Sequence, residues 1–188
     1  YNTLGMIINE AEKKGAENTT ELIELLSGMF RYNLQKEQYL VPLKKEIEYI
    51  QSYLLLLKKR YGEGFTAIFE LDHTLDEYPV PHIFLQPLIE NCIVHGSCAG
   101  QEKLDIIIRT LQTETEKLII IKNTGNILSR EQVKELNDMV QREFEVGKQE
   151  RVKTLQNINF RLKTACSGQC GLNFEFDENY VVLKIRIG

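Results

Sequence analysis

The sequence has no tryptophan and only four prolines, and no apolar run approaches the ~18 residues that a membrane helix needs. Polar residues occur within its first ten positions, so no secretory signal pattern opens the chain. Neither basic nor acidic residues are in large excess. The 23 basic and 27 acidic side chains give a net charge of -4 and a pI near 5.5. This balance argues against nucleic acid or an anionic membrane surface as the main partner.

What is present is the composition of an ordinary globular protein, with 188 residues of which 43% are hydrophobic and 27% charged. This length fits one large domain, or a small domain with a helical appendage. The chain opens at Tyr1 rather than at methionine, so we expect it to be part of a longer protein.

Cysteine is scarce and irregularly spaced, at Cys92, Cys98, Cys166 and Cys170. No CxxC pair occurs, and His73, His82 and His95 do not complete a zinc-binding pattern with the cysteines. We therefore expect reduced cytosolic thiols, with Cys92 as a small core residue inside an apolar segment.

Residues 1–62 follow a helical period. A first segment ends near Gly15, and a capping box of Asn18 and Glu21 predicts the start of a second helix. A third helix is expected after Pro42, a residue tolerated in a first turn. It carries an apolar stripe at 3–4 spacing, formed by Ile47, Ile50, Leu54, Leu57 and Tyr61. These helices are either part of a core or a dimerising hairpin, and periodicity leaves both interpretations open.

Residues 63–188 mix strands and helices. The patterns predict strands at 67–71, 104–111, 117–122, 172–176 and 181–187, with a hairpin turn at 112–116. Helices are expected at 82–95, 129–142 and 155–166, the second of them capped by Ser129. The predicted fold class is α+β, a two-layer α/β sandwich in which helices cover one face of a mixed sheet, preceded by an N-terminal helical hairpin.

Polar chemistry concentrates in the apolar helix at 85–96, LQPLIENCIVHG. Asn91 and His95 are four residues apart and so project from one helix face. A carboxamide oxygen there can coordinate Mg²⁺, while Glu90 can accept a proton or orient a nucleophile nearby. Taken alone, this Glu-Asn pair is also compatible with a helix that has one solvated polar edge.

This segment closely resembles the N box of sensor histidine kinases of the LytS/YesM type, which have a histidine kinase-like ATPase domain. Further stretches match in order. YNTL at 1–4 is similar to the end of the phosphoacceptor motif PHFLYNTL, and FRYNL at 30–34 resembles LRYSL. Residues 41–54 fit the following helix, and residues 157–162 fit the helix after the ATP lid.

The resemblance implies a cytoplasmic kinase portion that binds Mg-ATP and transfers the γ-phosphoryl group to a histidine. That histidine would lie just upstream of Tyr1. Residues 1–62 would form the dimerisation and phosphoacceptor region and residues 63–188 the ATP-binding catalytic domain. Glu90 would be catalytic, Asn91 would hold Mg²⁺, and His95 would contact phosphate. A homodimer through the N-terminal helices, a response regulator as partner and a membrane segment upstream are also implied.

The family's motif Asp-x-Gly-x-Gly is altered here. Asn123 stands at the position of the Asp that accepts a hydrogen bond from the adenine amino group, and Gly125 stands at the first glycine. Ile127 replaces the second glycine. A carboxamide oxygen can still accept from adenine, although without charge assistance. Without the resemblance, residues 123–126 read as a turn after a strand.

The family's second glycine motif has lost both glycines. Val152 and Thr154 stand at their positions, Asn157 keeps the family's asparagine, and Val94 replaces a phosphate-binding lysine. Thr154 could cap the helix through its hydroxyl. The charged segment 126–151 would be the ATP lid, with Lys148, Arg151 or Lys153 as substitute phosphate donors.

Two functions therefore compete. The first is an ATP-dependent histidine kinase that uses Mg²⁺, with nucleotide contacts from Asn91, His95, Asn123, Gly125, Thr154 and Asn157. The alternative is a degenerate, non-catalytic module of the same fold that acts in dimerisation and signal relay.

Overall fold

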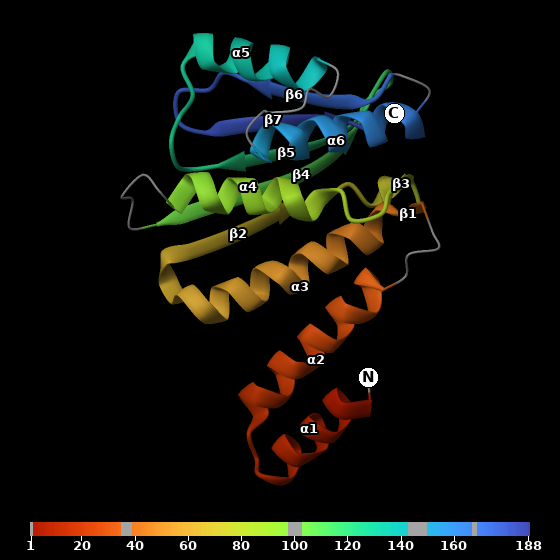
Figure 1. Ribbon diagram of the computed structural model, residues 1–188, viewed down its shortest axis with the longest axis vertical. Coiled ribbons are helices and arrows are strands. Elements are labelled where there is room, and N and C mark those ends of the chain that lie inside the picture. The colour runs from red at the N-terminus through yellow and green to blue at the C-terminus, as the bar shows by residue number, and fades with distance from the viewer. Residues whose placement is uncertain (1, 35–38, 98–102, 143–149, 167–168) are drawn as a thin grey trace.

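The computed structural model describes residues 2–34, 39–97, 103–142, 150–166 and 169–188. Two helices, α1 (Asn2–Lys13) and α2 (Glu17–Asn33), form a hairpin that extends away from the rest of the chain (Figure 1). Gly15, with φ of 65°, lies in the turn between them, as the sequence predicts. The predicted capping box is wrong: α2 already begins at Glu17, so Asn18 lies inside its first turn, and Ala16 at the N-cap makes no side-chain bond.

The third helix, α3 (Leu43–Tyr61), follows the short strand β1 (Leu40–Pro42). Pro42 is its N-cap rather than a first-turn residue, because it is still paired in β1 with β3 (Pro79–Pro81). Gly62 ends the helix with φ of 65°, a conformation that glycine adopts without steric cost. The short 3-10 turns η1 (Gly62–Gly64) and η2 (His73–Leu75) flank the next strand.

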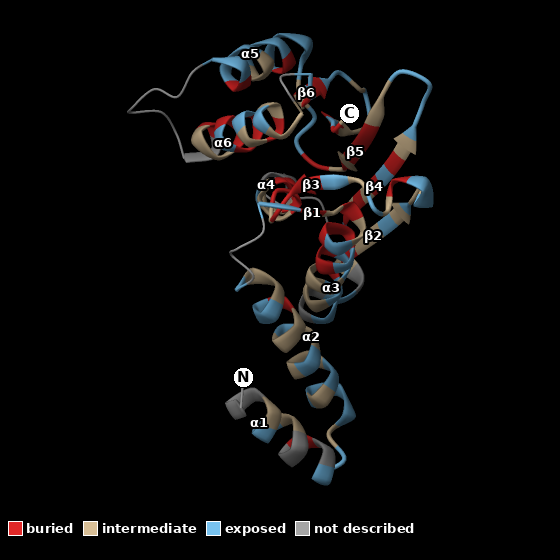
Figure 2. Cartoon of the chain, turned by 90° about the vertical axis from the view of Figure 1, so that its right-hand side faces the viewer, coloured by how far each residue is buried: buried red, intermediate tan, exposed pale blue. Residues whose placement is uncertain are grey.

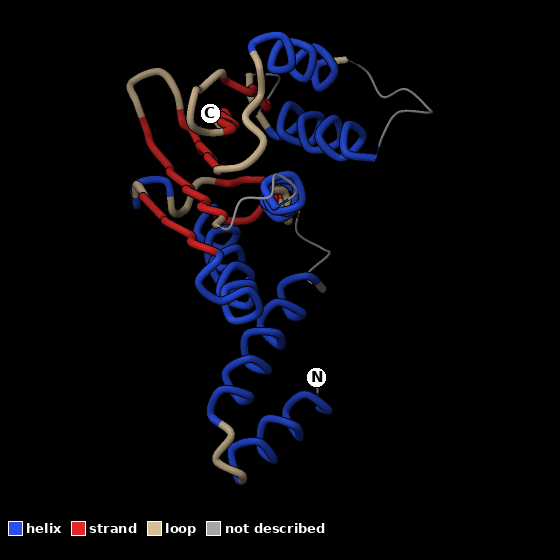
Figure 3. Tube along the Cα trace, turned by 90° about the vertical axis from the view of Figure 1, so that its left-hand side faces the viewer, coloured by secondary structure: helices blue, strands red, loops and turns tan. Residues whose placement is uncertain are grey.

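The main sheet has the order β2-β4-β5-β7-β6. Its strands are β2 (Phe65–Glu70), β4 (Leu104–Gln112), β5 (Lys117–Asn123), β6 (Gly171–Glu175) and β7 (Val181–Arg186). Only the β2–β4 pair is parallel, so the sheet is mixed. Helices α4 (Leu85–Ser97), α5 (Arg130–Gln141) and α6 (Glu150–Ala165) lie along one side of it (Figure 3).

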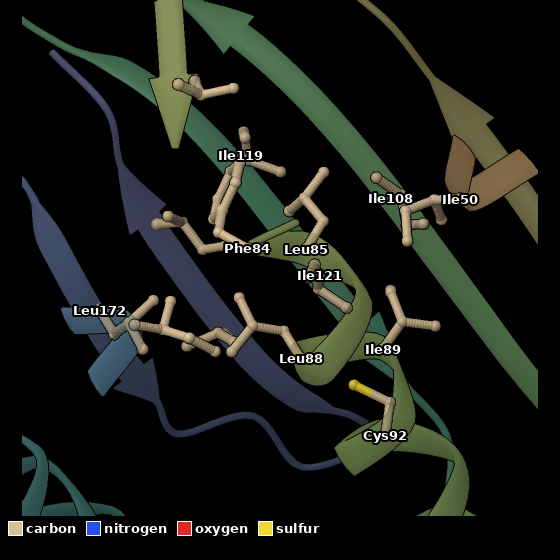
Figure 4. Close-up of a cluster of buried hydrophobic side chains, with 14 of the residues drawn as sticks. Ile50, Phe84, Leu85, Leu88, Ile89, Cys92, Ile108, Ile119, Ile121 and Leu172 are labelled. Atoms are coloured by element: carbon tan, nitrogen blue, oxygen red, sulfur yellow. The ribbon is translucent and has the colours of Figure 1, made fainter. Parts of the chain in front are cut away.

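The core lies between this sheet and the helices. In register, Ile108 pairs with Ile121 and Thr110 with Ile119. The three isoleucines belong to one buried cluster with Leu85, Leu88 and Ile89 of α4 (Figure 4). On the opposite face Ile68 is 44% exposed. Alternate burial along the strands therefore confirms the predicted fold, a mixed sheet with one face covered by helices.

Helix α3 contributes to the same core, whereas the hairpin of α1 and α2 is mostly exposed or half-buried (Figure 2). Ile50 and Leu54 of α3 are 0% and 2% exposed. The open choice between core helix and hairpin is thus resolved for α3 in favour of the core. The division into regions at residue 62 stays a prediction. No helix among the described residues is long and apolar enough to span a membrane.

Two helix starts differ from the sequence pattern. Helix α4 begins at Leu85 rather than at residue 82, because Ile83 has φ of 53° and breaks the helical backbone. Helix α6 begins at Glu150, several residues before the predicted start at 155. Helix α5 is as predicted, and Ser129 forms a complete capping box with Gln132.

The expectation of reduced thiols is wrong for one pair. Cys166, after the end of α6, and Cys170, before β6, form a disulfide across a Cα–Cα distance of 5.6 Å. The end of α6 lies close enough to the start of β6 for the two residues to bridge, which spacing alone did not indicate. Cys92 is a buried free thiol in the core, as predicted, and Cys98 lies outside the described residues.

Candidate functional site

A cavity of about 370 Å³ lies between α4, the end of β5 and the start of α5. Its volume falls in the range of small-ligand sites. It is lined by the apolar residues Leu88, Cys92, Ile127, Leu128, Leu155, Phe174, Val181 and Leu183, and by the amide residues Asn91, Asn123, Asn126 and Gln132. None of these lining residues is charged, so this part of the cavity suits an uncharged group that makes a few hydrogen bonds.

Asn123 enters this cavity because of the strand period. It ends β5 in alternation with Ile119 and Ile121, so it shares their inward face and lies opposite Val181 in register. The residue is 3% exposed, and its Nδ2 donates to the carbonyl oxygen of Thr124 at 3.0 Å. One N–H of the amide is used in that bond, and Oδ1 is the acceptor that can take a hydrogen bond from a ligand.

Asn91 reaches the cavity from the other side, on α4. Its Nδ2 donates to the carbonyl oxygen of Pro87, four residues earlier, at 2.9 Å. This back-bond fixes the carboxamide against its own helix and leaves Oδ1 as the ligand-binding atom of the amide. An oxygen donor is what Mg²⁺ prefers, so the side chain is suited to hold that ion.

The turn after β5 is fixed by its own residues. Thr124 accepts at Oγ1 from the backbone N–H of Asp105 at 2.9 Å and donates its own N–H to the Asp105 carbonyl at 3.0 Å. Gly125 then takes φ of 151°, where residues with a side chain are strained. The capping box at Ser129 starts α5 directly afterwards. The turn thus holds Asn123 in place at the cavity wall.

Comparisons with known proteins agree with this geometry. The histidine kinase family matches residues 1–65. The sensor histidine kinase/phosphatase LytS of Staphylococcus aureus is 30% identical over 163 residues, which cover 85% of this chain and 27% of that protein. The chain belongs to the sensor histidine kinase family. It spans about a quarter of the length of the curated relatives that it matches.

Solved histidine kinase structures have the same fold. The catalytic domain of histidine kinase ThkA, in a nucleotide-free form, aligns with a TM-score of 0.54 at 17% identity, covering 79% of this chain and 94% of that one. The histidine kinase domain of the blue-light activated EL346 protein from Erythrobacter litoralis aligns with a TM-score of 0.54 at 11% identity, covering 100% and 88%. At these identities the likeness establishes the fold.

Of the residues that the kinase resemblance singles out, Glu90 points elsewhere. It lies next to Asn91 on α4 but does not line the cavity. Its Oε1 accepts from Gln86 Nε2 at 2.8 Å, and Gln86 Oε1 accepts from the Tyr49 hydroxyl of α3 at 2.7 Å. Burial raises the pKa of Tyr49, and the Glu90 carboxylate adds to that shift. Glu90 therefore faces α3, on the side from which the N-terminal helices extend.

The kinase positions on α6 are not brought together with the two asparagines. Thr154 lies in the second turn of α6, so the expectation that it caps this helix is wrong: the helix starts four residues earlier. Val152 is buried at 7% exposure. Asn157 is exposed and lines a separate groove of about 610 Å³ with Phe160 and Lys163. Only Leu155 of this motif reaches the candidate site.

The predicted phosphate contacts of His95 and of the lid cations Lys148 and Arg151 involve side chains that the structure does not describe. The backbone of His95 lies in α4, but its side chain is outside the described residues, and so is that of Arg151. Lys148 lies outside the described residues altogether. Gly125 is next to the cavity in sequence but is not among its lining residues.

The apolar lining was not predicted from the sequence. Leu88, Phe174 and Leu183 read as core residues in the hydrophobic pattern, because a cavity wall and a core position have the same period. Gln132 also lines the cavity. Its position three residues after Ser129, which makes it the partner in a capping box, is the sequence signal that could have located it.

Proposed function

We propose that this chain binds Mg-ATP in the cavity between α4 and β5 and supplies the kinase chemistry of a two-component sensor protein. One observation carries the proposal. Asn91 and Asn123, to which the motif resemblance gave the metal and the base separately, line one cavity and each use an amide N–H in a bond within the protein, so that their oxygens can serve as acceptors. In an α/β sandwich with another function, we would not expect both amides to line the same cavity.

The end of the cavity at Asn123 suits adenine. Its Oδ1 can accept a hydrogen bond from the exocyclic amino group, while Leu88, Phe174 and Leu183 offer an apolar lining against which the ring would pack. At 3% exposure the amide is shielded from water, which strengthens such a bond.

The end at Asn91 suits a metal-bound phosphate chain. When bound, Mg²⁺ neutralises charge on the phosphate oxygens. Asn91 Oδ1 would hold the ion in position. Glu90 bonds Gln86, which in turn bonds Tyr49 of α3, and on this side it would orient or deprotonate a histidine presented from the N-terminal helices.

The hairpin supports the dimer that the family resemblance implies. Large apolar side chains are exposed along it, with Met6 at 72%, Phe30 at 45% and Leu34 at 60% exposure. Pairing two hairpins would bury this surface. A response regulator as partner and a cytoplasmic location below an upstream membrane segment follow from the resemblance and are part of the proposal.

One observation favours the alternative, a non-catalytic module. The residues at the positions of the family's second glycine motif lie inside α6. Only the first four N–H groups of a helix lack an intrahelical partner, and Thr154 is the fifth residue of α6. The backbone at 154–155 is therefore engaged within the helix, and phosphate contacts have to come from other donors.

The test is phosphorylation of the full-length protein with Mg-ATP labelled on the γ-phosphate. An acid-labile label on histidine is expected. Glu90→Gln should lower the rate of labelling and leave the Kd of Mg-ATP unchanged, whereas Asn91→Ala should weaken Mg-ATP binding itself. Glu114→Gln, in the exposed hairpin between β4 and β5, is the matched control. Nucleotide binding without any label would instead support the non-catalytic module.

A further inference from the structure

A fully buried carboxylate joins three helices beside the candidate site. Glu46 of α3 is 0% exposed. Its Oε1 accepts from the hydroxyl of Tyr32, in the last turn of α2, at 2.5 Å and from the N–H of Ile83 at 2.6 Å. Its Oε2 accepts from the N–H groups of Phe84 and Leu85 at 3.1 and 3.3 Å. One side chain thus contacts the end of α2 and the start of α4.

This carboxylate acts as the N-terminal cap of α4. The first turn of α4 contains no acidic residue of its own. The free N–H groups at a helix start and the helix dipole both favour a negative charge there. A buried carboxylate in turn needs such donors to offset its loss of hydration. The position of α4 and the position of the Glu46 side chain are therefore tightly linked.

The backbone at the contact is strained. Ile83 has φ of 53°, which is costly for a β-branched residue, and its N–H donates to Glu46. The preceding His82 is 8% exposed and packs edge-on to the Tyr32 ring, with centroids 4.5 Å apart. Its carbonyl accepts from the guanidinium of Arg161 in α6. Segment 82–85 is thus contacted by α2, α3 and α6 at the point where α4 begins.

We propose that Glu46 is a positioning residue that couples the end of α2 to Asn91 through α4. Leu85 and Asn91 are six residues apart in one helix, about 9 Å along its axis, so a displacement of the first turn is carried to the carboxamide. A shift of α2 must either break the Tyr32–Glu46 bond or move the carboxylate and the N–H groups bonded to it. This inference rests on the proposed nucleotide site at Asn91. The coupling is reciprocal, so a nucleotide at Asn91 would also bias the position of α2.

The test uses Tyr32→Phe, which removes one hydroxyl and keeps the ring against His82. Tyr180→Phe is the matched control, since Tyr180 is also half-buried but lies toward the open face of the sheet, near Lys122. The backbone N–H resonances of residues 83–85 and the side-chain amide resonances of Asn91 are compared by NMR, together with the thermal midpoint and the Kd of Mg-ADP. A second variant, Ile83→Gly, relieves the strained backbone but keeps its N–H.

The expected result is that Tyr32→Phe and Ile83→Gly both move the Asn91 side-chain resonances. Tyr32→Phe should weaken Mg-ADP about fivefold, and its thermal midpoint should lie below that of Tyr180→Phe because the buried carboxylate loses one donor. If Asn91 does not respond to Tyr32→Phe while residues 83–85 do, the contact is local and the coupling is refuted. If the unmodified chain does not bind Mg-ADP, the proposed function fails, and the Asn91 resonances alone then decide on the coupling.

Discussion

Replacing Asn123 by alanine should reduce the preference of this chain for ATP over GTP. One N–H of the Asn123 amide donates to the carbonyl oxygen of Thr124 at 3.0 Å, and Oδ1 is the acceptor that we assign to the purine. ATP presents an amino donor to that oxygen, whereas GTP presents a carbonyl oxygen. The side chain is 3% exposed, so water cannot replace the lost contact.

The magnitude follows from these contacts. A neutral hydrogen bond contributes about 0.5–1.5 kcal/mol, and a buried acceptor that faces another acceptor costs about 1–3 kcal/mol. The unmodified chain should therefore bind Mg-ATP at least about tenfold more tightly than Mg-GTP, since about 1.4 kcal/mol corresponds to a factor of ten. Asn123→Ala removes both effects, so the ratio of the two Kd values should fall toward one.

The assay is equilibrium binding of Mg-ATP and Mg-GTP by calorimetry. A ratio is used because a small loss of folded protein affects both nucleotides equally. Asn126→Ala, an exposed amide at the rim of the same cavity, is the matched control and should keep the ratio. An unchanged ratio in Asn123→Ala would refute the assignment of Asn123 to the adenine amino group.

Three further predictions concern the framework of the site. Ser129→Ala should lower the free energy of unfolding by about 1 kcal/mol, because it removes the capping box of α5; an unchanged midpoint in urea would contradict this. Asn159→Ala should cost about 2–5 kcal/mol in the same measurement, since Asn159 bonds the carbonyl of Val140 and the N–H of Leu172 in a buried position, whereas exposed Asn173→Ala should cost little. Burial and the neighbouring Glu46 carboxylate raise the pKa of Tyr32 above its usual value of about 10, so the folded protein keeps a proton that the unfolded chain loses. Its stabilising effect is complete below pH of about 10 and is lost at higher pH, and Tyr32→Phe should make the alkaline loss of stability shallower in thermal scans.

Periodicity predicted the fold well because the relevant contacts are local or repeat along a strand. The β-rich segments at 104–111 and 117–122 predicted β4 and β5, and Ser129 located the start of α5. The starts of α2, α4 and α6 were missed. Ile83 leaves the helical region, with φ of 53°, where its N–H bonds the distant Glu46, and no short-range pattern encodes that contact.

The candidate site was predictable only in part for the same reason. The family resemblance singled out Asn91 and Asn123, and the structure brings both to one cavity. Thr154 and Asn157 were inferred from motif position, but the glycine-free sequence continues α6 through these residues and directs Asn157 to another groove. The motif gives only the order of these residues along the chain. Which side chains reach the cavity depends on the backbone conformation, and that conformation differs when the glycines are absent.

Binding of Mg-ATP to the folded chain tests the central claim most directly, and the thermal midpoint reports it. At a nucleotide concentration ten times Kd, binding stabilises the folded state by about 1.4 kcal/mol, which corresponds to about 3–6 °C for a chain of this size. We predict such a rise with millimolar Mg-ATP, a smaller one when EDTA removes the metal, and little rise in Asn91→Ala. A midpoint that does not move with millimolar Mg-ATP would contradict a nucleotide site between α4 and β5.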